Sequence, residues 1–133
     1  MTDFGTSPSI QKSHIQKIHT FVDDVVFNSV NETYTAPGID VSDYRDFAIL
    51  IDLAVAFAPT DIVVRVQFSD DDSAYYNLMN GPFGDLRFED TAGAKKEAVV
   101  GKVIAPYMRI SVASSGCDAT NKFTLTVKVV LSK

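Results

Sequence analysis

Apolar and polar residues alternate along much of the chain with a period of two. Segment 47–57, FAILIDLAVAF, has large apolar side chains at every second position and mostly small ones between them. Segments 61–69, 107–114 and 122–131 repeat the alternation, with longer polar side chains on the second face. Successive side chains of a β-strand point to opposite faces of a sheet, so all four segments are predicted to be strands. The small second face of 47–57 also indicates that a neighbour half covers it.

Other regions give weaker strand signals and clear turn signals. Residues 19–36 indicate one or two β segments with less regular spacing, and 97–105 is a weaker strand candidate. Turn-forming Gly, Pro, Asn or Asp residues occur in the links 58–60, 80–85 and 114–121. About seven or eight strands, spaced by about ten residues, predict an all-β fold. We expect a single antiparallel β-sandwich, jelly-roll-like.

The N-terminal part is predicted to be an arm, because residues 9–19 permit only a short amphipathic turn or an extended segment. We therefore expect an arm at residues 1–20 and a sandwich domain at 21–133, the size of one domain. The alternative for the arm is a frayed tail. Four apolar residues of the arm could contact a neighbouring subunit: Phe4, Ile10, Ile15 and Ile18.

Composition and charge narrow the class of protein. An apolar fraction of 46% is typical of a globular protein. The net charge of -5 argues against nucleic acid or an anionic membrane as a partner, because both would repel the chain. The N-terminal residues lack the apolar core of a signal peptide, and no apolar run is long enough to span a membrane. Cys117 is the only cysteine, so no intramolecular disulfide forms, which fits assembly in a reducing cytosol.

Three consecutive aspartates, Asp70, Asp71 and Asp72, follow the second predicted strand. Carboxylate oxygens bind Ca²⁺, but the spacing lacks the Gly and Glu that an EF-hand loop requires. Neighbouring aspartates on an extended chain also point to opposite faces, so they do not converge on one ion. Aspartate tolerates a left-handed backbone and caps its own turn. The stretch is therefore predicted to be a solvated hairpin turn rather than a metal site.

No catalytic, cofactor or metal site is predicted. His14 and His19 are five residues apart, which suits neither a helical metal pair nor one face of a strand. No phosphate-binding, nucleophile-elbow or Cys-x-x-Cys motif is present. Asp52 interrupts an apolar strand, and we expect it on the outer face or in a strand-pair contact rather than as a general base. Cys117 has no activating base beside it, which favours an inert thiol.

Three tyrosines leave a binding function open. Tyr75, Tyr76 and Tyr107 could form an aromatic platform on which sugars stack, although aromatic residues are also ordinary strand formers and core anchors. Tyr75 and Tyr76 are neighbours, so one should face inward and the other outward. A carbohydrate- or receptor-binding module would require all three to be exposed together. An enzyme would require a cleft that joins His14 or His19 to Asp or Ser side chains.

The hairpin region resembles a known class of proteins. In small β-sandwich virion proteins of tailed phages, a strand ends in a hairpin of the form Q-x-S-x-D-G-x-x-W-x-x-L. Five residues of this chain fit that pattern in register: Gln67, Ser69, Asp71, Tyr75 and Leu78. Asp72 stands where the pattern has Gly, and Tyr75 where it has Trp. The later stretch YMRISV, with Arg109, is similar to the "+YVRV" strand of these proteins, and the resemblance covers about residues 36–131.

The resemblance implies a non-catalytic structural virion protein with no cofactor, most typically a capsid decoration (cement) protein. Such a protein binds the major capsid protein and its own copies, often as a homotrimer. It would assemble in the host cytoplasm and lie on the capsid exterior, where an acidic surface is kept away from packaged DNA. Within the same class, a head-completion or tail protein is the alternative.

Overall fold

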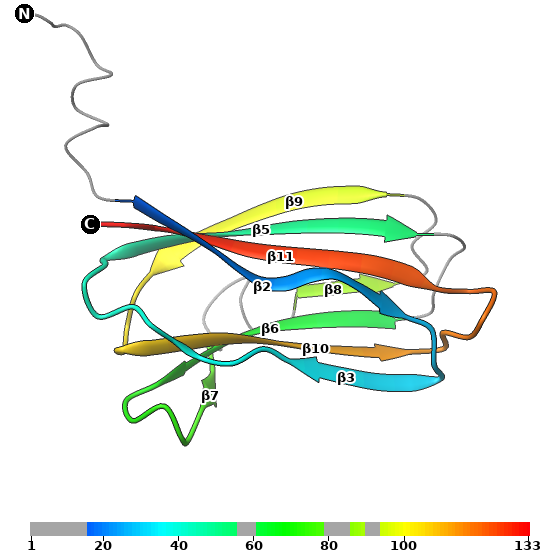
Figure 1. The fold of residues 1–133 in the computed structure, drawn as a ribbon, viewed down its shortest axis with the longest axis horizontal. Helices are drawn as coiled ribbons and strands as arrows, with labels where there is room; N and C mark the ends of the chain where they lie inside the picture. Colours follow the sequence, from blue (N-terminus) through cyan, green and yellow to red (C-terminus); the bar gives the residue numbers. More distant parts are fainter. Residues whose placement is uncertain (1–15, 56–60, 79–85, 90–93) are drawn as a thin grey trace, which may run out of the picture.

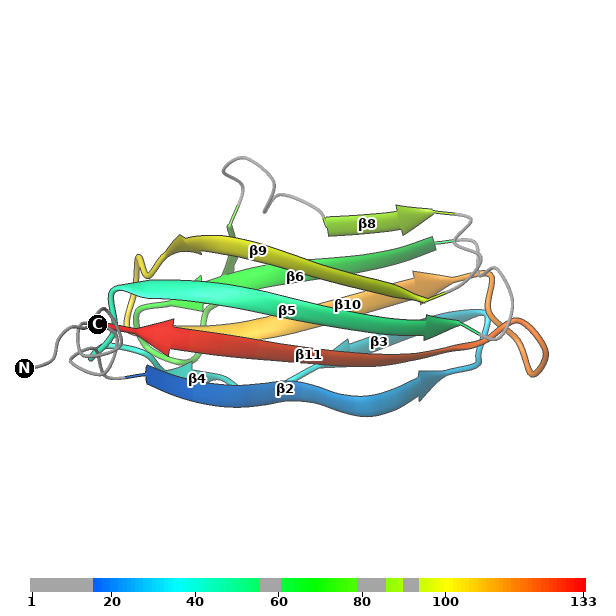
Figure 2. The same cartoon turned by 90° about the horizontal axis from the view of Figure 1, so that it is seen from above.

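The computed structural model describes residues 16–55, 61–78, 86–89 and 94–133, which form two antiparallel β-sheets packed face to face (Figures 1 and 2). This arrangement confirms the predicted all-β sandwich. The four-stranded sheet has the order β2 (Gln16–Phe27), β11 (Phe123–Ser132), β5 (Asp46–Val55) and β9 (Lys95–Lys102). The six-stranded sheet has the order β3 (Asn31–Thr35), β10 (Tyr107–Ser115), β6 (Asp61–Ser69) and β7 (Tyr76–Asn77), while β4 (Ile39–Asp40) pairs with β10 and β8 (Leu86–Glu89) with β6.

The connectivity is that of a jelly roll. Within the described ranges, the eight strands of four or more residues are, in chain order, β2, β3, β5, β6, β8, β9, β10 and β11. The first, eighth, third and sixth of them form one sheet, and the second, seventh, fourth and fifth form the other. The chain thus crosses repeatedly between the two layers, as in the double Greek key of jelly-roll domains.

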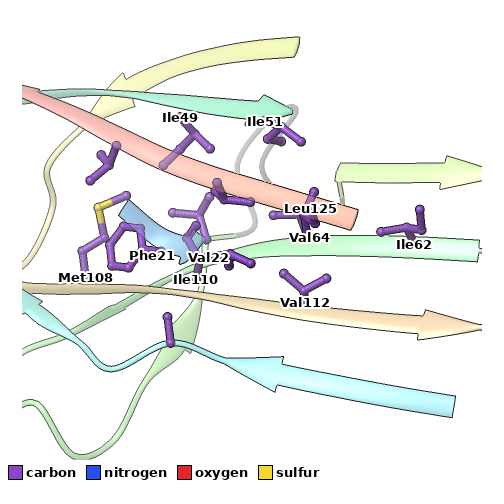
Figure 3. Close-up of a cluster of buried hydrophobic side chains, with 14 of the residues drawn as sticks. Phe21, Val22, Ile49, Ile51, Ile62, Val64, Met108, Ile110, Val112 and Leu125 are labelled. Atoms are coloured by element: carbon purple, nitrogen blue, oxygen red, sulfur yellow. The ribbon is translucent and has the colours of Figure 1, made fainter. Parts of the chain in front are cut away.

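The core lies between the sheets and follows the predicted alternation. In β5, β6, β10 and β11 every second side chain is buried, and these side chains interdigitate between the layers (Figure 3). The aromatic rings of Phe27 and Phe123 stack at one end of the core, with centroids 4.6 Å apart. The largest fully buried side chains are Phe27, Phe123, Ile49, Leu53, Ile62, Met108, Ile110, Leu125, Leu131, Val22, Val41 and Val64.

Strand β2 is irregular because its register against β11 shifts twice. Val127 pairs with Val22 while Lys128 pairs with Thr20, so Phe21 is an extra residue on β2. The second shift leaves one more extra residue near Asp24, which has a φ of 54°. Two bulges of this kind explain the less regular spacing in the part of segment 19–36 that belongs to β2.

The N-terminal boundary differs from the expectation. β2 begins at Gln16, and residues 16–20, predicted to belong to the arm, pair with the C-terminal end of β11. Residues 16–20 therefore belong to the sandwich and not to the arm, which corrects the predicted boundary at residue 21. The arm residues Phe4, Ile10 and Ile15 and the predicted links at 58–60 and 80–85 lie outside the described residues. Over the described ranges, no helix is long and apolar enough to cross a membrane.

Candidate functional site

The outer face of the four-stranded sheet has an apolar centre. Ile18, Val130, Ala48 and Val100 are directly opposite one another across the four strands. Leu50 and Ala98 form the adjoining pair on β5 and β9. Val100 is 72% exposed, Ile18 66% and Leu50 39%. We call the surface made by these six residues the apolar face.

Two ion pairs frame the apolar face where β5 runs beside β9. Lys102 Nζ lies 2.6 Å from Asp46 Oδ1, and Lys96 Nζ lies 2.8 Å from Asp52 Oδ2. Each pair joins residues directly opposite each other on the two strands. Asp52 is therefore on the outer face and in a strand-pair contact, as predicted. Exposed pairs of this kind contribute little to stability, so their main effect is on the charge pattern of the surface.

Two shallow hollows lie on the same surface. One, of about 450 Å³, is lined by residues of all four strands, including Gln16, Ala48, Val100 and Val130. The other, of about 360 Å³, is lined in part by Leu50, with Asp52 and Lys96 among its polar residues. None of the residues that line these two hollows has an exposed aromatic ring, so the surface offers shape and apolar contact rather than a stacking platform.

The outer face of the six-stranded sheet is polar and cross-linked by side chains. Arg109 Nε donates to Gln67 Oε1 at 2.7 Å, and Gln67 Nε2 donates to Asn77 Oδ1 at 2.8 Å. The guanidinium carbon of Arg109 lies 4.0 Å from the centroid of the Tyr75 ring. The Tyr75 hydroxyl in turn donates to Asp72. This chain of contacts fastens the hairpin after β6 to the sheet.

The aspartate stretch is the turn of that hairpin. Asp71 Oδ1 accepts hydrogen bonds from Ala74 N at 3.0 Å, Ser73 N at 2.9 Å and Ser69 Oγ at 2.9 Å. These donors lower the pKa of Asp71 from its ordinary value. Asp72 adopts a left-handed backbone with a φ of 59°. The predicted turn is confirmed. In the part of the chain that the structure describes, no group of three or more His, Cys, Asp or Glu side chains could hold a metal ion.

The three tyrosines do not form one platform. Tyr75 is half-buried beneath Arg109, and burial together with the hydrogen bond to Asp72 raises its pKa to about 12. Tyr76 pairs with Phe68, which places it on the opposite side of the sheet, where it is 66% exposed. Tyr107 is half-buried and neighbours Met108, whose side chain is in the core. The two side chains leave opposite sides of the sheet, as expected, but neither is buried in the core.

After the hairpin, the first side chain that packs against the core is that of Leu78, rather than Tyr75 or Tyr76. The Leu78 side chain packs against the core, and its backbone N–H donates to Val66 O at 2.9 Å. Sequence reasoning about a binding site also missed two residues around Tyr75. Arg109 covers its ring, and Gly38 lies so close that a Cβ there would overlap the Tyr75 hydroxyl. Only the basic residue of the YMRISV stretch gave a sequence signal for this contact.

Of the remaining candidates, the structure describes His19 and Cys117. His19 is half-buried and its ring meets Phe21 edge-on at 4.9 Å, and burial together with the charge of Lys17 lowers the pKa of His19. Cys117 is buried, and burial raises the pKa of its thiol, which disfavours the reactive thiolate. His14 lies outside the described residues.

Comparisons with known proteins show the fold. No protein-family model and no curated protein matches the sequence. PBSX exported protein XepA superposes with a TM-score of 0.57 at 10% identity, over 88% of this chain and 36% of XepA. Infectious bursal disease virus VP2, in a subviral particle, superposes with a TM-score of 0.54 at 12% identity, over 90% of this chain and 32% of VP2. A family 11 carbohydrate-binding module from Clostridium thermocellum has a TM-score of 0.45 at 10% identity, over 87% of this chain and 82% of the module.

The likenesses to XepA and VP2 support the jelly-roll fold and, at such low identities, do not extend beyond it. The chain spans about a third of the length of XepA and of VP2. The jelly roll occurs both in shells of viruses and in sugar-binding proteins. The choice between these functions therefore depends on the surfaces of this chain.

Proposed function

We propose that this chain is a structural protein of a tailed-phage virion, namely a capsid decoration protein that works by binding and performs no chemistry. Its partners would be the major capsid protein and further copies of itself. It would lie on the capsid exterior after assembly in the host cytoplasm. Its net charge of -5 suits a surface that stays away from packaged DNA.

The observation that carries this proposal is the apolar face. In an antiparallel sandwich the outer side of each sheet is normally polar, as it is around Arg109 and Gln67 on the six-stranded sheet. Val100 and Ile18 are instead large apolar side chains exposed over most of their area, and they lie in one row. A contiguous exposed apolar surface with a charged rim is typical of a protein–protein interface.

The geometry supports assembly better than sugar binding. A sugar-binding site needs an open aromatic ring beside polar side chains, and the ring of Tyr75 is covered by Arg109 on one face. Tyr76 is exposed but lies on the other side of the sheet. The fold neighbours are compatible with this preference, because VP2 was found in a subviral particle and XepA is described as a PBSX protein.

Immunogold electron microscopy of phage particles from the strain that encodes the chain tests the proposal. An antibody against the purified protein should label the capsid exterior of intact particles. Labelling of the neck or tail alone would instead favour a head-completion or tail protein. Particles that do not contain the chain, as measured by mass spectrometry, would refute a virion role altogether.

A further inference from the structure

We infer that the apolar face binds the same face of a second copy of this chain, in a two-fold dimer whose axis runs along the strands between β11 and β5. This inference deepens the proposed function, on which it rests, by naming the partner of the apolar face. It also makes a dimer, rather than the trimer expected by analogy, the first unit of assembly.

The row of apolar residues is self-complementary under this symmetry. A two-fold axis between β11 and β5 places β9 over β2 of the second copy, and β5 over β11. Val100 then faces Ile18 of the second copy, and Ala48 faces its Val130. A small side chain meets a larger one at the centre, and the outer contact joins the two most exposed apolar residues of the face. Ile18 of the second copy would enter the hollow of about 450 Å³ beside Val100.

The two rows beside the central row place no like charges opposite each other. In the row of Asp46 and Lys102, these residues face Ser132 and Gln16 of the second copy. In the row of Leu50 and Ala98, Leu50 faces the aliphatic part of Lys128 of the second copy. Every charged side chain of these rows therefore meets a neutral one across the interface.

The other in-plane two-fold axis, across the strands, is excluded by charge. That axis would place each strand over the same strand of the second copy, running in the opposite direction, and would exchange the two ends of the apolar face. Asp46 would then oppose Asp52, and Lys102 would oppose Lys96. Four like-charge contacts of this kind disfavour that arrangement, which leaves the axis along the strands.

The size of the sheet suits a stable dimer. Four strands at a spacing of about 4.8 Å give a width of about 19 Å, and ten paired residues at about 3.4 Å give a length of about 34 Å. Strands β5 and β11 pair over ten residues, from Asp46 with Ser132 to Val55 with Phe123. Face-to-face packing would then bury about 650 Å² on each copy and about 1,300 Å² in total, within the range of specific interfaces.

Charge substitutions at the outer contact test the arrangement in the full-length protein. Val100→Glu and Ile18→Lys each place a charge against an apolar residue of the second copy, and a symmetric dimer carries the change twice. Each single variant should raise the dimer dissociation constant by roughly 100-fold or more. The double variant pairs Glu with Lys across the interface and should restore association to within about tenfold of wild type. Within one copy the two positions are about 14 Å apart, so they cannot pair internally.

Sedimentation velocity over a range of concentrations measures the result. The wild type should sediment at twice the chain mass of 14.5 kDa. Val30→Glu is the matched control, because Val30 is 64% exposed but lies in the turn between β2 and β3, and this variant should remain dimeric. Near-ultraviolet circular dichroism shows that each variant remains folded.

Several results would overturn the inference. These are a wild-type monomer at all concentrations, a trimer, or a dimer that neither single substitution weakens. A dimer that the single substitutions break but the double variant does not restore would contradict the proposed axis. Failure of the proposed function is distinguishable from failure of the inference. A dimer absent from virions would refute only the virion role, and a monomer on the capsid would refute only the dimer.

Discussion

The hairpin after β6 allows a quantitative test of how its turn is held. Asp72 has a φ of 59°, and a left-handed backbone costs an L-residue about 1–2 kcal/mol. Glycine avoids this cost but lowers the stability of the fold by about 0.5–1 kcal/mol, because it has greater conformational freedom in the unfolded chain. Asp72→Gly should therefore gain about 0.5–1 kcal/mol from the backbone. The same substitution removes the acceptor of the Tyr75 hydroxyl, a hydrogen bond worth about 1 kcal/mol net.

The two effects offset each other only while Tyr75 keeps its hydroxyl. In the wild type, Asp72→Gly should change the free energy of unfolding by less than about 0.5 kcal/mol. In a Tyr75→Phe background the hydrogen bond is already absent, and the substitution should stabilise the protein by about 0.5–1 kcal/mol. The phenyl ring still lies under Arg109, so Tyr75→Phe removes little besides the hydroxyl.

Urea unfolding of the four proteins at one fixed protein concentration gives the double-mutant cycle. The expected coupling between the two positions is about 1 kcal/mol. A coupling below about 0.3 kcal/mol would show that the hydrogen bond contributes nothing to stability. Destabilisation by Asp72→Gly in both backgrounds would show that the left-handed backbone carries no cost at this position.

Three further outcomes follow from other contacts. The pKa of Tyr75 is raised to about 12 in the folded protein from about 10 in the unfolded chain. The contribution of protonated Tyr75 to the stability of the fold is therefore complete below pH 10 and is lost as the pH rises through 12. Ultraviolet titration should show one tyrosine that ionises at higher pH than the others, and Tyr75→Phe should abolish that step. If the step persists in Tyr75→Phe, it belongs to another tyrosine. Phe123→Ala removes a buried ring stacked on Phe27 and should lower the free energy of unfolding by about 3–5 kcal/mol in urea titrations, whereas a loss below about 1 kcal/mol would contradict the packing. Lys96→Ala breaks an exposed pair with Asp52 and should cost less than about 0.5 kcal/mol, so a loss above 1 kcal/mol in the same assay would show that the pair is structural.

The main strands could be predicted from the sequence because their signal is local. The alternation of β5, β6, β10 and β11 depends only on which side of the backbone each side chain leaves. The turn at Asp71 and Asp72 was equally predictable, because an aspartate caps its own turn and tolerates a left-handed backbone without help from distant residues. The outward position of Asp52 followed from the same alternation.

The start of the sandwich was less accessible to sequence reasoning. β2 carries two bulges against β11, and each bulge breaks the period of two on which strand prediction depends. Residues 16–20 therefore looked like part of an arm, although Gln16 pairs with Ser132 at the far end of the sheet. That pairing joins segments more than a hundred residues apart, and no local pattern specifies it.

The surfaces were decided by tertiary structure. The sequence showed that the second face of β5 is small and apolar, but not that Val130, Ile18 and Val100 from three other strands continue that surface in a single row. It showed a tyrosine pair, but not that Arg109 covers the ring of Tyr75. Alternation is a local property of each strand's sequence, so the sequence determined which residues face the core. The order of strands in the jelly roll depends on the packing of the whole chain, and only that order determined which outward residues meet to form a site.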